Sequence, residues 1–267
     1  MKGYTELAPY RQQFKEGVPM LMYHHVRRAP WRTALPMMYV PPALFSRQME
    51  ELKAAGFESA PPAAEDQKGS RPRFHLSFDD GFRNVLANAA PVLERTGFRG
   101  IQYLVPKQIG KTNAWDMGAN CQEPLMDRKE IRDWLAAGQW IGAHTMTHPR
   151  LTRIPVAQAR EEIQASRKAL EDMFGVEVKH FAYPYGDWNE QVANLVGEAG
   201  FATACTTVFG INTAGTPPFQ LARLTSRYAN RGWDRLQGAV ARRLWRIGNG
   251  KACRFPRESN DNPSDQK

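Results

Sequence analysis

The chain has 267 residues, a formal net charge of +9 and three cysteines, and this length suffices for one large α/β domain or two small ones. No apolar run approaches the roughly 20 residues that span a bilayer, and the first residues contain no recognisable secretory leader. We therefore expect a soluble, cytoplasmic protein. The cysteines, Cys121, Cys205 and Cys253, are widely spaced, which predicts reduced thiols and no cysteine metal site.

Strands and helices are predicted to alternate along most of the chain. A strand at 18–26 precedes a helix over 44–56, in which Phe45, Met49 and Leu52 share one face. Further strands are predicted at 73–78, 100–105, 139–143, 179–183 and 201–207, and further helices at 84–96, 128–138, 155–175 and from Asn189 onward. A capping box of Asp127 and Glu130 opens the second of these helices. This alternation indicates βαβ units and a parallel sheet, either open or closed into a barrel.

We predict a single domain over 15–230, a basic amphipathic helix over 231–250 and a disordered tail over 251–267. Residues 231–257 contain eight Lys and Arg against Asp234 alone, which places +7 of the net charge in this stretch. Such a helix can lie on an anionic membrane surface at the inner face of the membrane, or can pack on the barrel with a solvated basic face. Nucleic acid binding is not expected, because no aromatic platform or zinc finger accompanies the charge.

Reactive side chains occur where predicted strands end. Tyr23, His24 and His25 end the first strand, Asp79 and Asp80 the second, His144 and His148 follow a third, and Tyr183 to Tyr185 follow a fourth. The carboxyl ends of parallel strands gather on one face of the sheet, so these side chains are expected to converge. Each motif alone is also compatible with an ordinary turn or an exposed histidine pair.

The chemistry of these groups fits a hydrolytic metal site. Two histidines in an HxxxH pattern and one carboxylate suit Zn²⁺ with open positions, although a similar set also holds iron or cobalt. Asp80 beside a cation would stay ionised, which leaves Asp79 free to accept a proton from water. The turn "YPYG" offers backbone N–H groups that can stabilise an oxyanion.

The segments "SFDDG", "HTMTH" and "YPYG" resemble three motifs of the NodB-type polysaccharide deacetylases, carbohydrate esterase family four. The resemblance covers about residues 18–228. It implies a distorted (β/α) barrel, a divalent metal (Zn²⁺ first, with Co²⁺, Ni²⁺ or Fe²⁺ as alternatives) and removal of N-acetyl groups from N-acetylglucosamine-type sugars. Asp79 matches the family's base, Asp80, His144 and His148 match its metal ligands, and the Tyr185 N–H matches its oxyanion donor.

Two positions depart from the family pattern. The arginine that orients the base is replaced by Ala182, and no histidine follows His180 to match the family's acid. Because "MLMYHHV" resembles an N-terminal segment of permuted relatives, His24 is the candidate acid, and strand alternation places only one of His24 and His25 on the site side. For the missing arginine we nominate Arg223, with an ordinary surface arginine as the alternative.

The leading functional hypothesis is a metal-dependent de-N-acetylase that acts on an amino-sugar glycan or its lipid-linked precursor, as in exopolysaccharide biosynthesis. Two alternatives stay open. A carbohydrate-binding pseudoenzyme on the same barrel is suggested by the missing arginine, and the same metal and base could also hydrolyse a non-sugar amide. A serine hydrolase is not expected, because the chain contains no GxSxG motif.

Overall fold

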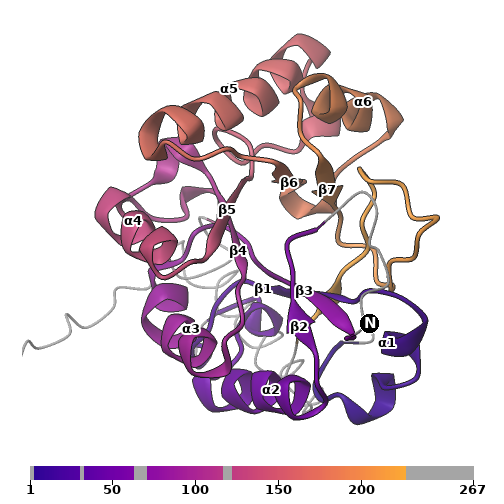
Figure 1. The fold of residues 1–267 in the computed structure, drawn as a ribbon. Coiled ribbons are helices and arrows are strands. Elements are labelled where there is room, and N and C mark those ends of the chain that lie inside the picture. The colour runs from indigo at the N-terminus through magenta and orange to yellow at the C-terminus, as the bar shows by residue number, and fades with distance from the viewer. Residues whose placement is uncertain (1–2, 31–32, 63–70, 117–121, 227–267) are drawn as a thin grey trace, which may run out of the picture.

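A parallel β-sheet surrounded by helices forms the centre of the computed structural model (Figure 1), which describes residues 3–30, 33–62, 71–116 and 122–226. The strands are β1 (Met20–Tyr23), β2 (Glu58–Ser59), β3 (Arg73–Phe78), β4 (Ile101–Leu104), β5 (Trp140–Ala143), β6 (His180–Ala182), β7 (Thr203–Cys205) and β8 (Leu224–Thr225). The helices are α1 (Gln13–Glu16), α2 (Pro42–Ala54), α3 (Arg83–Thr96), α4 (Arg128–Ala136), α5 (Val156–Phe174) and α6 (Glu190–Glu198). The predicted helix over 231–250 and tail over 251–267 lie outside the described residues.

The sheet has the strand order β7-β6-β5-β4-β3-β1-β8, with β2 beside the start of β3, and the pairings between these strands are parallel. A parallel bridge between Cys205 and Leu221 joins the segment before β8 to β7, while β8 itself pairs with β1. The two ends of the sheet therefore meet. The predicted distorted (β/α) barrel is confirmed. The segment that closes it places residue 223 between β7 and β1.

Helices form because apolar residues recur at helical spacing, and their ends carry recognisable signals. The predicted face of α2 is buried at Phe45, Met49 and Leu52, and each such side chain stabilises the fold by about 1.5–3 kcal/mol. The capping box of Asp127 and Glu130 is present at the start of α4. No helix among the described residues is both long enough and apolar enough to cross a bilayer.

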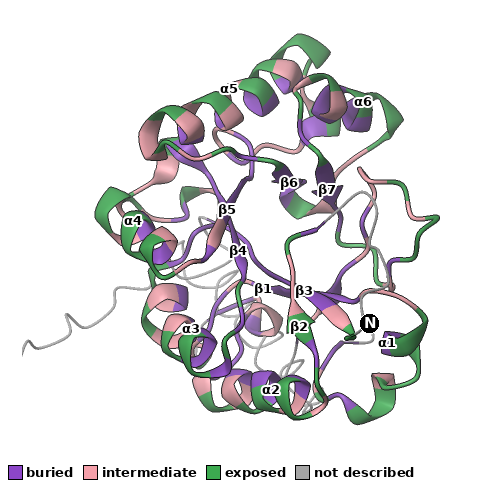
Figure 2. Ribbon diagram, viewed as in Figure 1, coloured by how far each residue is buried: buried purple, intermediate pink, exposed green. Residues whose placement is uncertain are grey.

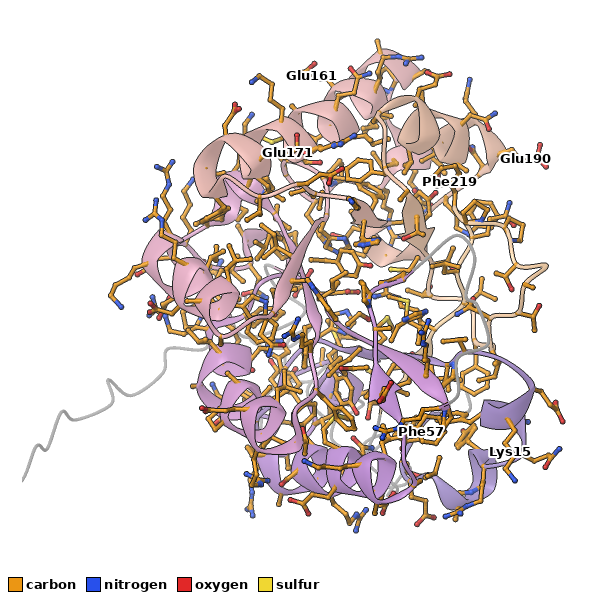
Figure 3. All side chains as sticks on the ribbon, viewed as in Figure 1. Lys15, Phe57, Glu161, Glu171, Glu190 and Phe219 are labelled. Atoms are coloured by element: carbon orange, nitrogen blue, oxygen red, sulfur yellow. The ribbon has the colours of Figure 1, made fainter. Side chains whose placement is uncertain are left out.

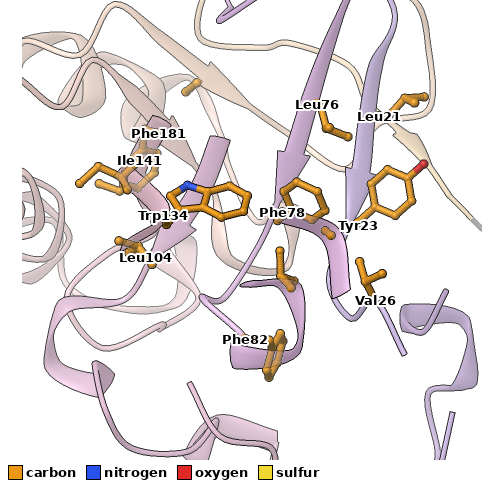
Figure 4. Close-up of a cluster of buried hydrophobic side chains, with 14 of the residues drawn as sticks. Leu21, Tyr23, Val26, Leu76, Phe78, Phe82, Leu104, Trp134, Ile141 and Phe181 are labelled. Carbon is orange, nitrogen blue, oxygen red and sulfur yellow. The ribbon is translucent and has the colours of Figure 1, made fainter. Parts of the chain in front are cut away.

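The core lies between the strands and the helices. Figure 2 shows buried residues along the strands and on the inner sides of the helices, with exposed residues on the outer sides. In the close-up of Figure 4, Trp134 of α4 meets Phe78 of β3, with ring centroids 5.8 Å apart and planes at 88°. Tyr23 lies on the other side of Phe78 at 5.6 Å. This packing fixes the end of β3, where the aspartate pair begins.

Segments outside the predicted elements also join the core. Tyr4 and Leu7 are buried, and the Tyr4 N–H donates to the Thr225 carbonyl at 2.9 Å. No strand or helix was predicted in this N-terminal segment. Residues 58–59, which lie outside the predicted strands and helices, form β2, because their backbone pairs with β3.

Candidate active site

The motif residues converge at one edge of the sheet. His24 follows β1, Asp79 and Asp80 follow β3, His144 follows β5, and Tyr185 lies in the turn after β6. Parallel strands bring their carboxyl ends to the same face, which is why residues distant in sequence meet there. The structure thus assembles the constellation that the sequence predicted.

Asp80, His144 and His148 form a buried cluster that could hold a metal ion, with one potential ligand atom from each residue within 4.8 Å of the others. The Asp80 Oδ1 atom lies 3.5 Å from His144 Nε2 and 3.3 Å from His148 Nε2. These separations are long for hydrogen bonds, and the buried Asp80 Oδ1 has no hydrogen-bond partner. Tetrahedral ligands at about 2.0–2.2 Å from Zn²⁺ stand roughly 3.4 Å apart, so the donor set fits a divalent cation.

The protonation of the two histidines also suits metal binding. His144 Nδ1 lies 2.7 Å from the Ala182 carbonyl, which therefore accepts its proton and leaves Nε2 as the ligand atom. Burial lowers the pKa of His148, despite the opposing effect of Asp80, and so favours the neutral imidazole that binds metals. Burial would raise the pKa of Asp80, but His144 and His148 hold it well below its ordinary value.

Asp79 is paired with Arg223. The Arg223 guanidinium donates to both carboxylate oxygens of Asp79, at 2.7 and 2.8 Å, and its Nε donates to the Thr206 carbonyl at 2.7 Å. The Arg223 side chain is 0% exposed, so the alternative of a surface arginine is wrong. Burial would raise the pKa of Asp79, but Arg223 outweighs it, and the carboxyl titrates below its ordinary range. The segment before Arg223 forms a single bridge at Leu221, and β8 begins only after Arg223.

His24 and His25 point to different environments. His24 Nε2 lies 3.7 Å from Asp79 Oδ2, and the side chain is 18% exposed. His25 is fully buried, with its ring 4.1 Å from Tyr39 and 3.7 Å from Phe82. Burial lowers the pKa of His25 well below its ordinary value. The structure therefore places His24 at the site and His25 in the packing behind it.

The "YPYG" turn presents Tyr185 in a left-handed backbone conformation, with φ 61° and ψ 6°. Its N–H donates to no acceptor among the described residues, so it is available to an oxygen of a substrate. Gly186 follows with φ 66°, and a Cβ atom there would lie 2.0 Å from Thr207 Oγ1. The turn therefore depends on glycine at this position.

Backbone strain is concentrated at this site. Among the described residues other than glycine, positive φ occurs at Asp80 (75°), Thr145 (61°), His148 (69°) and Tyr185 (61°). Such conformations cost roughly 1–3 kcal/mol each and persist where the surrounding structure enforces them. All four lie in the motif segments. The surrounding structure therefore holds the motif residues in unfavourable backbone conformations that orient their side chains and N–H groups.

Two residues near the site were missed by the sequence analysis. The Trp115 ring stacks on His148 at 4.3 Å and 21°, and Arg150 lies over the Tyr185 ring with its Cζ 4.1 Å from the centroid. Trp115 belongs to a single 3-10 turn, Ala114–Asp116, in the connection between β4 and α4, which is too short for a periodic pattern to mark it. Arg150 follows "HTMTHP" by one position, so its proximity to the motif was the available signal.

Comparison with known proteins identifies the family. The polysaccharide deacetylase family model matches residues 66–204, and the chain therefore belongs to this family of hydrolases. The matched segment contains Asp79, Asp80, His144, His148 and Tyr185. It excludes His24 and Arg223, whose placement at the site comes from the tertiary structure.

Individual relatives agree with this family. YxkH of Bacillus subtilis strain 168 is 24% identical over 213 residues, covering 78% of this chain and 70% of that protein. The poly-beta-1,6-N-acetyl-D-glucosamine N-deacetylase of Staphylococcus aureus strain MSSA476 is 23% identical over 219 residues, covering 72% of this chain and 73% of that protein. The Streptococcus pyogenes deacetylase PplD, solved in complex with acetate, is 21% identical with a TM-score of 0.71, over 83% of this chain and 97% of that one. This structural similarity shows that the two chains share the same fold.

Proposed function

We propose that the protein is a metal-dependent de-N-acetylase that hydrolyses the N-acetyl groups of an amino-sugar glycan or its lipid-linked precursor. The observation that carries the proposal is the division of partners between two adjacent carboxylates. Asp80 faces two imidazole Nε2 atoms at 3.5 and 3.3 Å, whereas Asp79 is held by Arg223 with His24 at 3.7 Å. One aspartate is thus equipped to bind a cation and its neighbour to accept a proton.

Asp80, His144 and His148 would hold the divalent metal, with Zn²⁺ as the first candidate and Co²⁺, Ni²⁺ or Fe²⁺ as alternatives. When bound, the metal would lower the pKa of water and polarise the acetyl carbonyl. The remaining steps are carried out by side chains and one backbone N–H group at the carboxyl ends of the strands.

Asp79 accepts the proton of the attacking water, and Arg223 keeps this carboxylate oriented and ionised. The Tyr185 N–H donates to the oxygen on which negative charge develops. His24 then gives a proton to the amide nitrogen, so that the C–N bond breaks and a neutral amine leaves. The products are acetate and the free amino sugar.

The choice of a glycan substrate is supported by family membership and by the Staphylococcus aureus relative, whose name states an N-acetylglucosamine polymer. The pseudoenzyme alternative was motivated by the missing arginine at position 182. Arg223 now occupies the equivalent chemical role beside Asp79, so that motivation falls away.

A cytoplasmic location at the inner face of the membrane remains part of the proposal. Its support is the excess of Lys and Arg over 231–257 in the sequence, which is suited to anionic lipids. Co-sedimentation with vesicles containing anionic lipid would test it, and the expected result is binding that is lost in high salt. Equal binding to neutral vesicles, or none to either, would contradict this part.

The enzymatic proposal is tested by acetate release from N-acetylglucosamine oligomers, combined with elemental analysis. We expect Asp79→Asn to retain metal and to lose about 10²-fold to 10⁴-fold in rate, the usual contribution of acid-base catalysis. Asp80→Asn should lose both metal and activity. If the two variants contain the same amount of metal, the proposed division between the aspartates is incorrect.

A further inference from the structure

Glu162, on helix α5, contacts the loop that joins the two histidine ligands. Its Oε2 atom accepts the backbone N–H groups of Met146 and Thr147, at 2.8 and 2.9 Å, and its Oε1 atom accepts the Thr147 hydroxyl at 2.6 Å. The side chain is buried, with the residue only 8% exposed. Three donors from two consecutive loop residues thus converge on one carboxylate.

The loop needs an external support of this kind because it is not a regular element. Thr145 and His148 both have positive φ, and the Thr145 hydroxyl bridges the loop by donating to the His144 carbonyl and accepting the His148 N–H. These internal contacts connect the ligand-bearing residues to each other. They do not fix the loop to helix α5, which is the function left to Glu162. On its other side the loop has a backbone contact, in which the Lys107 N–H donates to the Met146 carbonyl at 3.2 Å.

Glu162 in turn depends on the loop between His144 and His148 for its hydrogen-bond donors. A buried carboxylate requires hydrogen-bond donors, and Glu162 forms no ion pair with any described Lys or Arg. Its donors are those of residues 146 and 147. The carboxylate is therefore satisfied when the loop has the conformation that turns both imidazoles toward Asp80.

We propose that Glu162 is a positioning residue for the metal centre, which sets the loop between His144 and His148 in its ligating conformation from the outer helix layer. The inference rests on the proposed function, because it requires that His144 and His148 bind a metal. It assigns Glu162 no contact with substrate. Its predicted effect is on metal affinity and coordination geometry.

The test measures Co²⁺ binding to the metal-free full chain, because Co²⁺ affinity and its visible absorption spectrum are observables separate from turnover. We expect Glu162→Gln to weaken Co²⁺ binding about 10-fold to 100-fold, the usual cost of losing a partner behind metal ligands, and to change the spectrum. Glu161→Gln is the matched control, since Glu161 is the exposed neighbour on the same helix and lies on its outer side in Figure 3. It should bind Co²⁺ like the wild type.

Thr147→Val provides a milder variant in case Glu162→Gln does not fold. It removes one of the three contacts and should weaken Co²⁺ binding about threefold to tenfold, the effect of a single hydrogen bond. When Glu162→Gln and Thr147→Val are combined, the losses of Co²⁺ affinity should be less than additive, because both changes act on the same contact.

Three results overturn the inference. Wild-type Co²⁺ affinity in folded Glu162→Gln, or in Thr147→Val, would show that the loop keeps its conformation without these contacts. An equal loss of Co²⁺ affinity in Glu161→Gln would show that the effect comes from removing a negative charge from α5 and not from the contact with the loop. A wild-type protein that binds no Co²⁺ would overturn the proposed metal-dependent function as well, which separates the two failures.

Discussion

Asp79 and Asp80 are adjacent in sequence but have different partners. Successive side chains of a strand point to opposite sides, so two consecutive carboxylates would not normally reach one site. Asp80 departs from strand geometry with φ 75°, and this left-handed conformation brings its carboxylate to the two histidines while Asp79 meets Arg223. A single strained residue therefore allows one motif to direct one carboxylate to the two histidines and the other to Arg223.

The Arg223 contact leads to a prediction about stability and pH. Arg223→Met leaves the buried Asp79 without its cation, and loss of one partner of a buried pair costs about 3–5 kcal/mol in the free energy of unfolding. Because Arg223 lowers the pKa of Asp79, its removal should also move the acid limb of the kcat/KM profile to higher pH. Denaturant titration and pH profiles measure the two effects.

Arg71→Met is the control, because Arg71 forms an exposed ion pair with Glu58 and should change stability by less than about 1 kcal/mol. An acid limb that stays at its wild-type pH in Arg223→Met would contradict the orienting role.

The histidine pair gives a second prediction. His24→Ala should keep its metal and fold but lose about 10²-fold to 10⁴-fold in amide hydrolysis, because the amine leaves without a proton donor. An activated acetate ester needs no such proton, so its cleavage should stay near the wild-type rate. His25→Ala should mainly lower Tm, since its ring packs between Tyr39 and Phe82.

Equal loss of ester and amide hydrolysis in His24→Ala would argue against its role as the acid. Normal deacetylation by this variant, with failure of a folded His25→Ala, would transfer the role to His25.

At the scale of elements, four strands (β1, β3, β5 and β6) are followed by reactive groups at their carboxyl ends and carry packing groups elsewhere. β6 illustrates this division, because it begins at the buried His180 and ends beside the turn that holds Tyr185. His180 Nδ1 lies 2.9 Å from Thr203 Oγ1 of the neighbouring strand β7. Burial lowers the pKa of His180 to about 4, so the imidazole is neutral in the folded protein at physiological pH.

This lowered pKa predicts a loss of stability in acid. The unfolded chain protonates His180 near pH 6.5 and the folded chain near 4, so unfolding takes up a proton between these values. The stabilising effect is complete above pH 6.5 and is lost as the pH falls, by roughly 3 kcal/mol at pH 4. His25 and His148 contribute with the same sign, since their pKa values are also lowered.

His180→Gln, which cannot be charged, should flatten the curve of unfolding free energy against pH between 7 and 4. Denaturant titrations at several pH values would measure it. A slope identical to that of the wild type would show that His180 does not contribute.

At the scale of the molecule, the barrel is closed by a short segment late in the described chain. Leu221 pairs with β7 and Leu224 with β1, so residue 223 lies where the two ends of the sheet meet. The N-terminal segment pairs with the end of this closing segment, with Tyr4 bridged to Ser226. The active site therefore depends on closure of the whole sheet, in addition to the motifs.

Metal removal should accordingly affect the whole fold. A ligand present at 100 times its Kd stabilises the native state by about 2.7 kcal/mol, which corresponds to roughly 5–10 °C in Tm for a domain of this size. We expect a chelator to lower Tm by this amount and added Zn²⁺ to restore it, measured by calorimetry. Asp80→Asn should show no such response, and a chelator effect that persists in this variant would place the stabilising metal elsewhere.

The sequence by itself determined the order of β1, β3 to β7 and α2 to α6, the capping box of α4 and the motif residues Asp79, Asp80, His144, His148 and Tyr185. These features are local, because apolar periodicity, capping signals and short motifs are written within a few consecutive residues. The ends of strands were less well defined: the strand predicted over 18–26 forms only Met20–Tyr23, which leaves both histidines beyond its end.

The tertiary structure alone decided which distant groups complete the site. Arg223 reaches Asp79 across 144 positions, and Glu162 reaches the histidine loop from a helix whose own pattern shows only an amphipathic surface. The choice between His24 and His25 likewise depended on the packing of His25 against Tyr39 and Phe82. Such contacts arise from closure of the barrel and from packing between layers, and no local periodicity encodes which side chains these bring together.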